Sequence, residues 1–210
     1  MLNIIYEDNH IIVVEKPRNI PVQGDLSGDT DLMTMIKDYL RDRYDKKGNV
    51  FLGLIHRLDR PVGGLMVFAK TSKAASRLSE QVRNGTFEKS YEALVHGTPP
   101  STGVFEDYLL KDQKTNISSV VPKGTDGSKY AKLDYKVVGT ENECSRVKIH
   151  LVTGRSHQIR VQFSTRGFPL LNDVKYGLGE KGNIALYSTG ISFLHPTKKE
   201  RMNFSLKSDF

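Results

Sequence analysis

The feature that most constrains the fold is a strict alternation of apolar with polar or charged residues in two stretches of the chain. The apolar positions are Leu133, Tyr135 and Val137 in the first stretch and Val147, Ile149 and Leu151 in the second. Successive side chains of a strand point to opposite faces, so this period of two buries one face and leaves the other in solvent. The alternation therefore predicts half-buried antiparallel strands.

Helical periodicity predicts three helices among further strands. The helices are expected over residues 30–45, from Ser72 as N-cap to Asn84, and over 156–166 with Ser156 as N-cap, and the strands over residues 2–6, 11–15, 65–69, 90–96, 185–194 and 202–206. Because strands and helices do not alternate regularly, the order favours an α+β fold with a mixed, largely antiparallel β-sheet flanked by helices and loops. The polar stretch 111–130 contains two glycines and is expected to be a mobile surface excursion.

Length and charge indicate one domain with a polyanionic partner. A chain of 210 residues can bury a full core, so we expect a single domain over residues 1–210. Lysine and arginine number 31 against 24 acidic residues, a formal charge of +7. Such an excess favours a polyanion over an acidic small molecule as partner, the alternative being a basic surface without one.

Cysteine usage and hydropathy indicate a cytoplasmic protein. Cys144 is the single cysteine, so no intramolecular disulfide and no thiolate zinc site can form. The N-terminal residues lack a signal-peptide pattern, and no run approaches the roughly 20 apolar residues of a membrane span. We therefore expect neither a membrane association nor a metal.

The stretch IHRLDRPVGG, residues 55–64, places Asp59 between two arginines just before the apolar run LMVFA. Nearby guanidinium groups favour an ionised carboxylate, which suits a nucleophile or a base. A solvated surface ion pair is the alternative. The position at the entrance of a buried strand favours a site.

Two later stretches carry further candidates. In KSYEALVHG, residues 89–97, Tyr91 can present an aromatic face and a hydroxyl to a ligand, although a core tyrosine fits equally well. In VTGRSHQIRVQF, residues 152–163, Gly154 makes a turn, and Arg155 and His157 lie at the start of the predicted helix. Arg160 can point from that helix towards a carboxylate, or lie on the surface.

Together these stretches are much more specific than each one alone. The order of HRLD, Lys-x-Tyr-x-Ala-x-Val-x-Gly and Gly-Arg-Ser-His-Gln-Ile-Arg-Val resembles the RluA-type family of RNA pseudouridine synthases, and YEDNHIIVVEKPRNIPVQ is similar to that family's first strand pair. The resemblance extends over nearly the whole chain from Tyr6. It implies the catalytic domain of that family, beginning almost at Met1 without the S4 RNA-binding domain that relatives often carry.

The resemblance also implies roles for individual residues. It makes Asp59 the catalytic carboxylate, pairs Arg160 with it, and packs Tyr91 against the target base. Four residues are further candidates for substrate binding or loop support, namely His56, Arg57, Arg155 and His157, and Leu186 is a candidate for the apolar lining of the pocket. A structural role for the two histidines is an equally good interpretation.

The implied reaction agrees with the chemistry of these residues. Converting uridine to pseudouridine breaks the N1–C1′ bond and rejoins the uracil through C5, so atoms balance without a redox cofactor or metal. The reaction needs one ionised carboxylate in a closed pocket, and the uridine must be flipped out of its stack. A basic protein gains sequence-independent affinity for RNA from phosphate contacts.

Several alternatives stay open. A non-catalytic RNA-binding protein of the same fold would be expected to lack Asp59 or Arg160, and a glycoside hydrolase would need a second carboxylate. Departures from the family's usual residues, at Val62-Gly63, Gln162, Phe168 and 185–188, concern substrate choice more than activity. The target can be ribosomal or transfer RNA, residues 111–130 are the first candidate for selecting it, and relatives favour a monomer.

Overall fold

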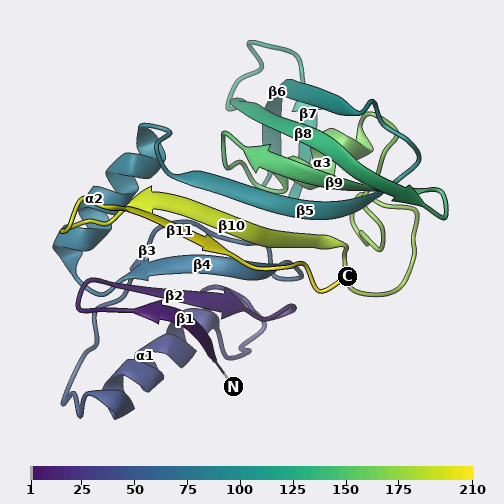
Figure 1. The fold of residues 1–210 in the computed structure, drawn as a ribbon. Coiled ribbons are helices and arrows are strands. Elements are labelled where there is room, and N and C mark those ends of the chain that lie inside the picture. The colour runs from purple at the N-terminus through teal and green to yellow at the C-terminus, as the bar shows by residue number, and fades with distance from the viewer. Residues whose placement is uncertain (1) are drawn as a thin grey trace. The chain divides into compact units, whose positions relative to one another are not determined.

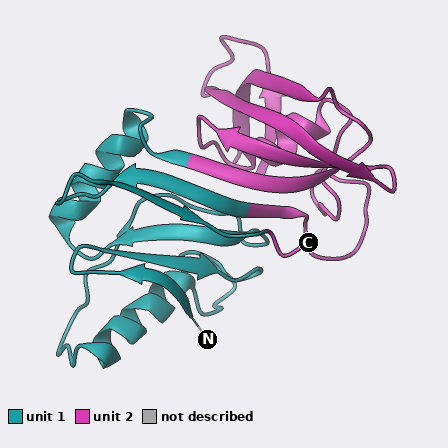
Figure 2. Cartoon of the chain, viewed as in Figure 1, with its two compact units in different colours: residues 1–88, 188–207 teal, residues 89–187, 208–210 magenta. Residues whose placement is uncertain are grey.

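The computed structural model describes residues 2–210, which form two compact units (Figures 1 and 2). The first unit contains the chain up to Glu88 and Ser188–Lys207; the second contains Lys89–Tyr187 and Ser208–Phe210. Both combine paired strands with helices, so the predicted α+β class is confirmed. The single domain over residues 1–210 stays a prediction. Within residues 2–210 no helix is long and apolar enough to span a membrane.

The first unit is built on the two most apolar strands of the chain. Its strands are β1 (Asn3–Glu7), β2 (Ile11–Lys16), β3 (Gly53–Leu54), β4 (Gly63–Ala69), most of β10 (Leu186–Leu194) and β11 (Arg201–Ser205), and its helices are α1 (Leu32–Arg43) and α2 (Ser72–Arg83). β2 and β4 pair antiparallel, and all of β4 is buried, as its unbroken apolar sequence requires. α2 packs Ala74 and Leu78 against this part of the sheet.

Two side-chain caps determine where the helices of the first unit begin. Asp31 accepts a hydrogen bond from the Thr34 amide at 3.1 Å, so α1 begins at Leu32, inside the predicted range. Thr71 accepts one from the Ala74 amide at 3.2 Å. The prediction of Ser72 as N-cap is therefore wrong by one residue, because the hydroxyl of Thr71 stands on extended backbone and already fills that position.

The second unit is an antiparallel sheet that carries one short helix. Its strands are β5 (Glu88–His96), β6 (Thr102–Asp112), β7 (Ile117–Val121), β8 (Lys129–Glu141) and β9 (Cys144–Leu151), in the order β5-β9-β8-β6-β7, and its helix is α3 (Gln158–Ser164). The alternation that predicted β8 and β9 is matched by their alternating burial. Phe163 of α3 packs edge-on against Phe105 and Tyr135, with ring centroids 4.9 and 5.2 Å away. This aromatic cluster fixes α3 on β6 and β8.

Two local predictions in the second unit are wrong. Ser156 does not cap a helix: α3 begins at Gln158, after His157 with a left-handed backbone (φ 53°) and no side-chain cap. Residues 111–130 do not form a loose excursion either. The β-branched residues of β7 pair this strand with the end of β6, from Tyr108↔Val121 to Asp112↔Ile117, so that only the turns on either side of it lack strand structure.

Gly64 of β4 lies against the backbone of Ser188, so a substitution there measures how tightly this strand is packed. Its backbone has φ 116°, and a Cβ atom there would lie 2.3 Å from the backbone oxygen of Ser188. We expect Gly64→Ala to lower the free energy of unfolding by about 3 kcal/mol or more, since backbone strain and overpacking add. Gly85 also has a positive φ, 71°, but open space around it, so Gly85→Ala should cost only about 1 kcal/mol. Urea unfolding followed by circular dichroism measures both, and equal losses would contradict the close approach.

Candidate functional site

In the first unit the predicted catalytic carboxylate lies on a turn between β3 and β4. Asp59 is half-buried, and its carbonyl accepts a hydrogen bond from the Val62 amide at 3.0 Å. Lys16, at the end of β2, is fully buried and donates to the carbonyl oxygens of Pro17, Arg60 and Val62 at 2.9, 2.9 and 2.8 Å. All three ammonium hydrogens therefore donate to backbone carbonyls, two of which lie in the turn that follows Asp59.

The Lys16 ammonium is unusual because its side chain is fully buried. Burial lowers the pKa of Lys16 to about 7, with the positive charges of Arg18 and Arg60 adding to the fall, while Asp59 opposes it. Asp59 is thus near enough to stabilise the ammonium electrostatically. Lys16 was not among the predicted site residues, although a lysine two residues after the apolar run IIVV was the available signal.

The other residues of the HRLDR stretch divide between structure and surface. His56 accepts a hydrogen bond from the Val67 amide at Nε2, 3.2 Å away, and its ring packs against Phe87 with centroids 5.3 Å apart. Arg57 is exposed. Arg60 forms ion pairs with Asp25 and Asp29. His56 thus supports β4, whereas Arg57 is the arginine of this stretch that is available to an anion.

In the second unit Tyr91 and Arg160 are both buried. Tyr91 is 5% exposed on β5 and stands opposite Ile149 of β9. Arg160 is 3% exposed on α3, and its Nε and Nη2 donate to the two carboxylate oxygens of Asp173 at 2.8 and 2.6 Å. This bidentate geometry fixes the plane of the guanidinium.

Asp173 is the buried carboxylate that orients Arg160. Burial raises the pKa of Asp173, but hydrogen bonds and charge from Arg160, with the amides of Lys175 and Tyr176, outweigh it and hold the pKa below its ordinary value. The carboxylate is therefore ionised at neutral pH. The sequence offered no motif for this residue, since the partner predicted for Arg160 was Asp59. That pairing stays a prediction.

The turn before α3 is held by a hydrogen-bond network that was not predicted from the sequence. Gln158 is 2% exposed; its Oε1 accepts from Thr153 Oγ1 and the Arg155 amide at 2.7 and 3.0 Å, and its Nε2 donates to the Lys132 carbonyl at 3.1 Å. Arg155 itself is exposed, with Nε donating to the Tyr130 carbonyl at 2.7 Å. A buried glutamine thus presents Arg155 from a fixed backbone.

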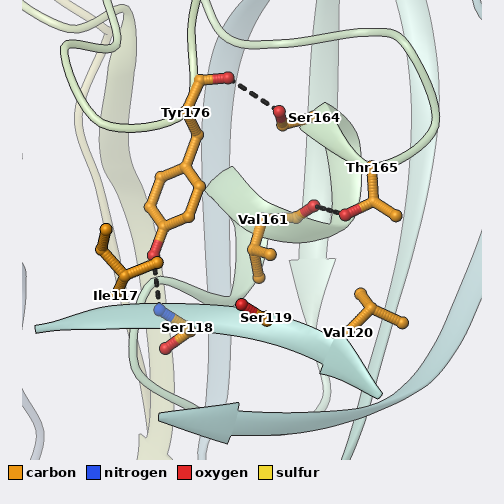
Figure 3. Close-up of a pocket in the computed structure, with 8 residues that line it drawn as sticks. All are labelled: Ile117, Ser118, Ser119, Val120, Val161, Ser164, Thr165 and Tyr176. Atoms are coloured by element: carbon orange, nitrogen blue, oxygen red, sulfur yellow. Dashed lines mark hydrogen bonds between the residues drawn. The ribbon is translucent and has the colours of Figure 1, made fainter. Parts of the chain in front are cut away.

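His157 and Tyr176 connect this turn to β7. His157 Nδ1 lies 2.7 Å from the Tyr176 hydroxyl, which also accepts a hydrogen bond from the Ser118 amide at 2.8 Å. Figure 3 shows Tyr176 reaching from the Ser164 side of α3 to β7. The histidine therefore supports the fold locally; a contact with a phosphate stays a prediction.

A pocket of about 320 Å³ lies beside this connection (Figure 3). It is lined by Ile117, Ser118, Ser119, Val120, Val161, Ser164, Thr165 and Tyr176. None of the predicted site residues lines it. Leu186 is 4% exposed at the start of β10. No group of three or more metal-ligating side chains is found in the described part of the chain.

Comparison with known proteins gives consistent results. A family model described as RNA pseudouridylate synthase matches residues 10–165. Ribosomal large subunit pseudouridine synthase D of Vibrio cholerae is 33% identical over 97% of this chain and 66% of its own length. RNA pseudouridine synthase YjbO of Bacillus subtilis, named as uncharacterized, is 35% identical over 97% and 71%. The chain thus spans about two thirds of the length of these relatives.

A solved structure has the same fold. Human RNA pseudouridylate synthase domain containing 4 superposes with a TM-score of 0.81 at 22% identity, over 98% of this chain and 88% of that one. At this identity the likeness concerns the fold alone.

The buried ammonium of Lys16 makes stability depend on pH. Its pKa of about 7 in the folded chain lies below the ordinary value of 10.5, so between these values the unfolded chain binds a proton that the folded chain does not. Stability from this group rises with pH in that window, by up to about 1.4 kcal/mol per pH unit. We expect the unfolding free energy of wild type, relative to that of Lys16→Met, to increase by about 2 kcal/mol from pH 7 to pH 9, because only wild type gains stability from this group.

Urea unfolding at the two pH values measures this difference. The exposed Lys47 provides the control, since the gap between wild type and Lys47→Met should not change with pH. A gap for Lys16→Met that is constant from pH 7 to pH 9 would refute the assignment of a buried, titrating ammonium.

Proposed function

We propose that this chain, which belongs to the RNA pseudouridylate synthase family, isomerises uridines in RNA to pseudouridines. The observation that carries the proposal is the turn that follows Asp59, whose Arg60 and Val62 carbonyl oxygens accept hydrogen bonds from the buried Lys16 ammonium. A carboxylate that attacks the nucleotide or removes a proton from it must be positioned before the substrate arrives. In this proposal the turn would hold the carboxylate in that position at the entrance of β4.

Two buried side chains of the second unit would complete the chemistry. Tyr91 would pack its ring against the flipped uracil, because stacking retains a base whose glycosidic bond has been cut. Arg160 would face Asp59 and keep it ionised, with Asp173 holding the guanidinium in the required plane. Leu186 would add apolar wall to the pocket. The step balances without a redox partner: the N1–C1′ bond is exchanged for a C5–C1′ bond, the C5 hydrogen leaves to water and N1 gains a proton from water.

RNA would be held chiefly through its phosphates. The formal charge of +7 and the exposed Arg57 and Arg155 favour a polyanion. The V. cholerae relative is named for the ribosomal large subunit, which makes ribosomal RNA the first substrate to test, with transfer RNA second. We further propose that the chain acts as a single catalytic domain and a monomer, in the cytoplasm.

A binding protein without catalysis is the competing proposal, and Asp59 separates the two. Asp59→Asn should abolish tritium release from [5-³H]uridine-labelled RNA, since the C5 hydrogen leaves only when C5 bonds to the sugar. RNA affinity should stay within a few-fold, because the amide keeps the size of the side chain. The assay needs ribosomal and transfer RNA separately, without added metal or cofactor.

The matched control is Asp42→Asn, an exposed carboxylate on α1, which should retain full turnover. Tritium release that persists in Asp59→Asn would contradict the assignment of Asp59 as the catalytic carboxylate. Release from neither RNA by wild type, with binding intact, would favour the non-catalytic protein.

The turns on either side of β7 carry exposed lysines that would contact the RNA and so contribute to its selection. Lys114 lies between β6 and β7, and Lys123 between β7 and β8. We expect the double change Lys114→Glu and Lys123→Glu to weaken RNA binding at least tenfold and to lower the slope of log Kd against log salt by about two. Filter binding at several salt concentrations measures both quantities. Lys47→Glu with Lys73→Glu, on the first unit, is the charge-matched control, and equal losses in both doubles would argue against a special role of these turns.

A further inference from the structure

The Lys89 side chain is a buried cation without a counter-charge. It lies at the start of β5 and is 7% exposed, and neither a hydrogen bond nor an ion pair of its ammonium is found among residues 2–210. The other buried cations discussed above, Lys16 and Arg160, donate to carbonyl and carboxylate oxygens. Burying a charge in this way is unfavourable unless a partner arrives.

The surroundings of Lys89 add positive charge. A Cβ atom on Gly154 would lie 3.2 Å from the Lys89 ammonium nitrogen, so the ammonium lies directly against the backbone of this exposed glycine. Burial first, and the charge of Arg155 second, lower the pKa of Lys89 to about 8. Two cations thus converge on the turn 153–155, which repels further cations and attracts an anion.

This turn is rigid before any ligand binds. Gln158 holds it through Thr153 and the Arg155 amide, and the Arg155 Nε is tied to the Tyr130 carbonyl. The anion would therefore meet donors that need little rearrangement, which is the condition for a strong site.

The alternation of β5 places Lys89 beside the predicted base contact. Lys89, Tyr91, Ala93 and Val95 are the buried positions of this strand, so Lys89 and Tyr91 share one face. Two residues along a strand span about 7 Å, comparable to the separation of a base from its own backbone. A nucleotide whose uracil stacks on Tyr91 can therefore place a phosphate near Lys89.

We propose that Lys89 and Arg155 form a subsite for a backbone phosphate of the RNA next to the target uridine, with the exposed Gly154 carrying no side chain that would shield the ammonium from it. This inference rests on the proposed function, which places RNA at Tyr91, and adds a residue to which the sequence analysis gave no role. The phosphate supplies the counter-charge that the protein omits. The ligand chemistry is a phosphate oxyanion, whether from RNA or from free phosphate.

Lys89→Met and Lys89→Arg test the charge at nearly constant length. Lys89→Met should weaken RNA binding about tenfold and reduce the salt slope by about one, because one phosphate contact is lost. Lys89→Arg should retain the slope. The melting temperature of Lys89→Met should equal or exceed that of wild type, since the buried cation is removed. Lys73→Met, on the exposed surface of α2, is the control and should leave affinity and slope unchanged.

Each other outcome overturns a defined part of the proposal. Unchanged affinity and slope in Lys89→Met would remove the subsite, and equal losses in the Arg and Met variants would assign Lys89 to packing. If inorganic phosphate raised the melting temperature of wild type while Lys89→Met bound RNA normally, the site would belong to free phosphate. Tritium release is measured in parallel: wild type that binds RNA through Lys89 without releasing tritium would refute the reaction and leave the subsite standing.

Discussion

The buried ammonium of Lys16 is the interaction on which the predicted catalytic turn depends. A turn that leaves a sheet and re-enters it as β4 exposes carbonyl oxygens to a dry interior, and such oxygens need donors. Lys16 supplies three donors from one atom, at distances of 2.8 to 2.9 Å. The conformation after Asp59 is therefore set by a residue more than 40 positions earlier, and the carboxylate stands on backbone that side-chain packing alone would not hold.

The second unit uses a different arrangement for the same purpose. Aromatic packing of Phe163 on Phe105 and Tyr135 fixes α3 as a body, and the carboxylate of Asp173 then fixes the guanidinium of Arg160 within it. Apolar contacts are not directional, so they can place a helix but cannot orient a charged group. A bidentate ion pair can, and its burial makes the orientation costly to lose.

The sequence was informative wherever a local pattern determines the structure. Alternation located β8 and β9, the apolar run located β4, and helical spacing located α1 and α2 within two residues. The failures at Ser156 and at residues 111–130 arose where a polar composition concealed long-range pairing: β7 pairs with β6, and the turn before α3 is held by the bond from Gln158 to the Lys132 carbonyl. Partners such as Asp173 carry no local signal, because only the fold brings position 173 to position 160.

Lys16 and Lys89 are two buried lysines whose surroundings differ. Both lysines lie at strand ends on buried positions, and both have pKa values lowered by loss of water. Lys16 offsets part of that loss by donating to three carbonyls of its own chain, whereas Lys89 lies against the backbone of Gly154 and near the charge of Arg155. A fold selected for stability alone would place an apolar residue at position 89, since nothing within the described chain compensates the charge. The difference between the two lysines is therefore a difference between a charge used to build the site and a charge held ready for its ligand.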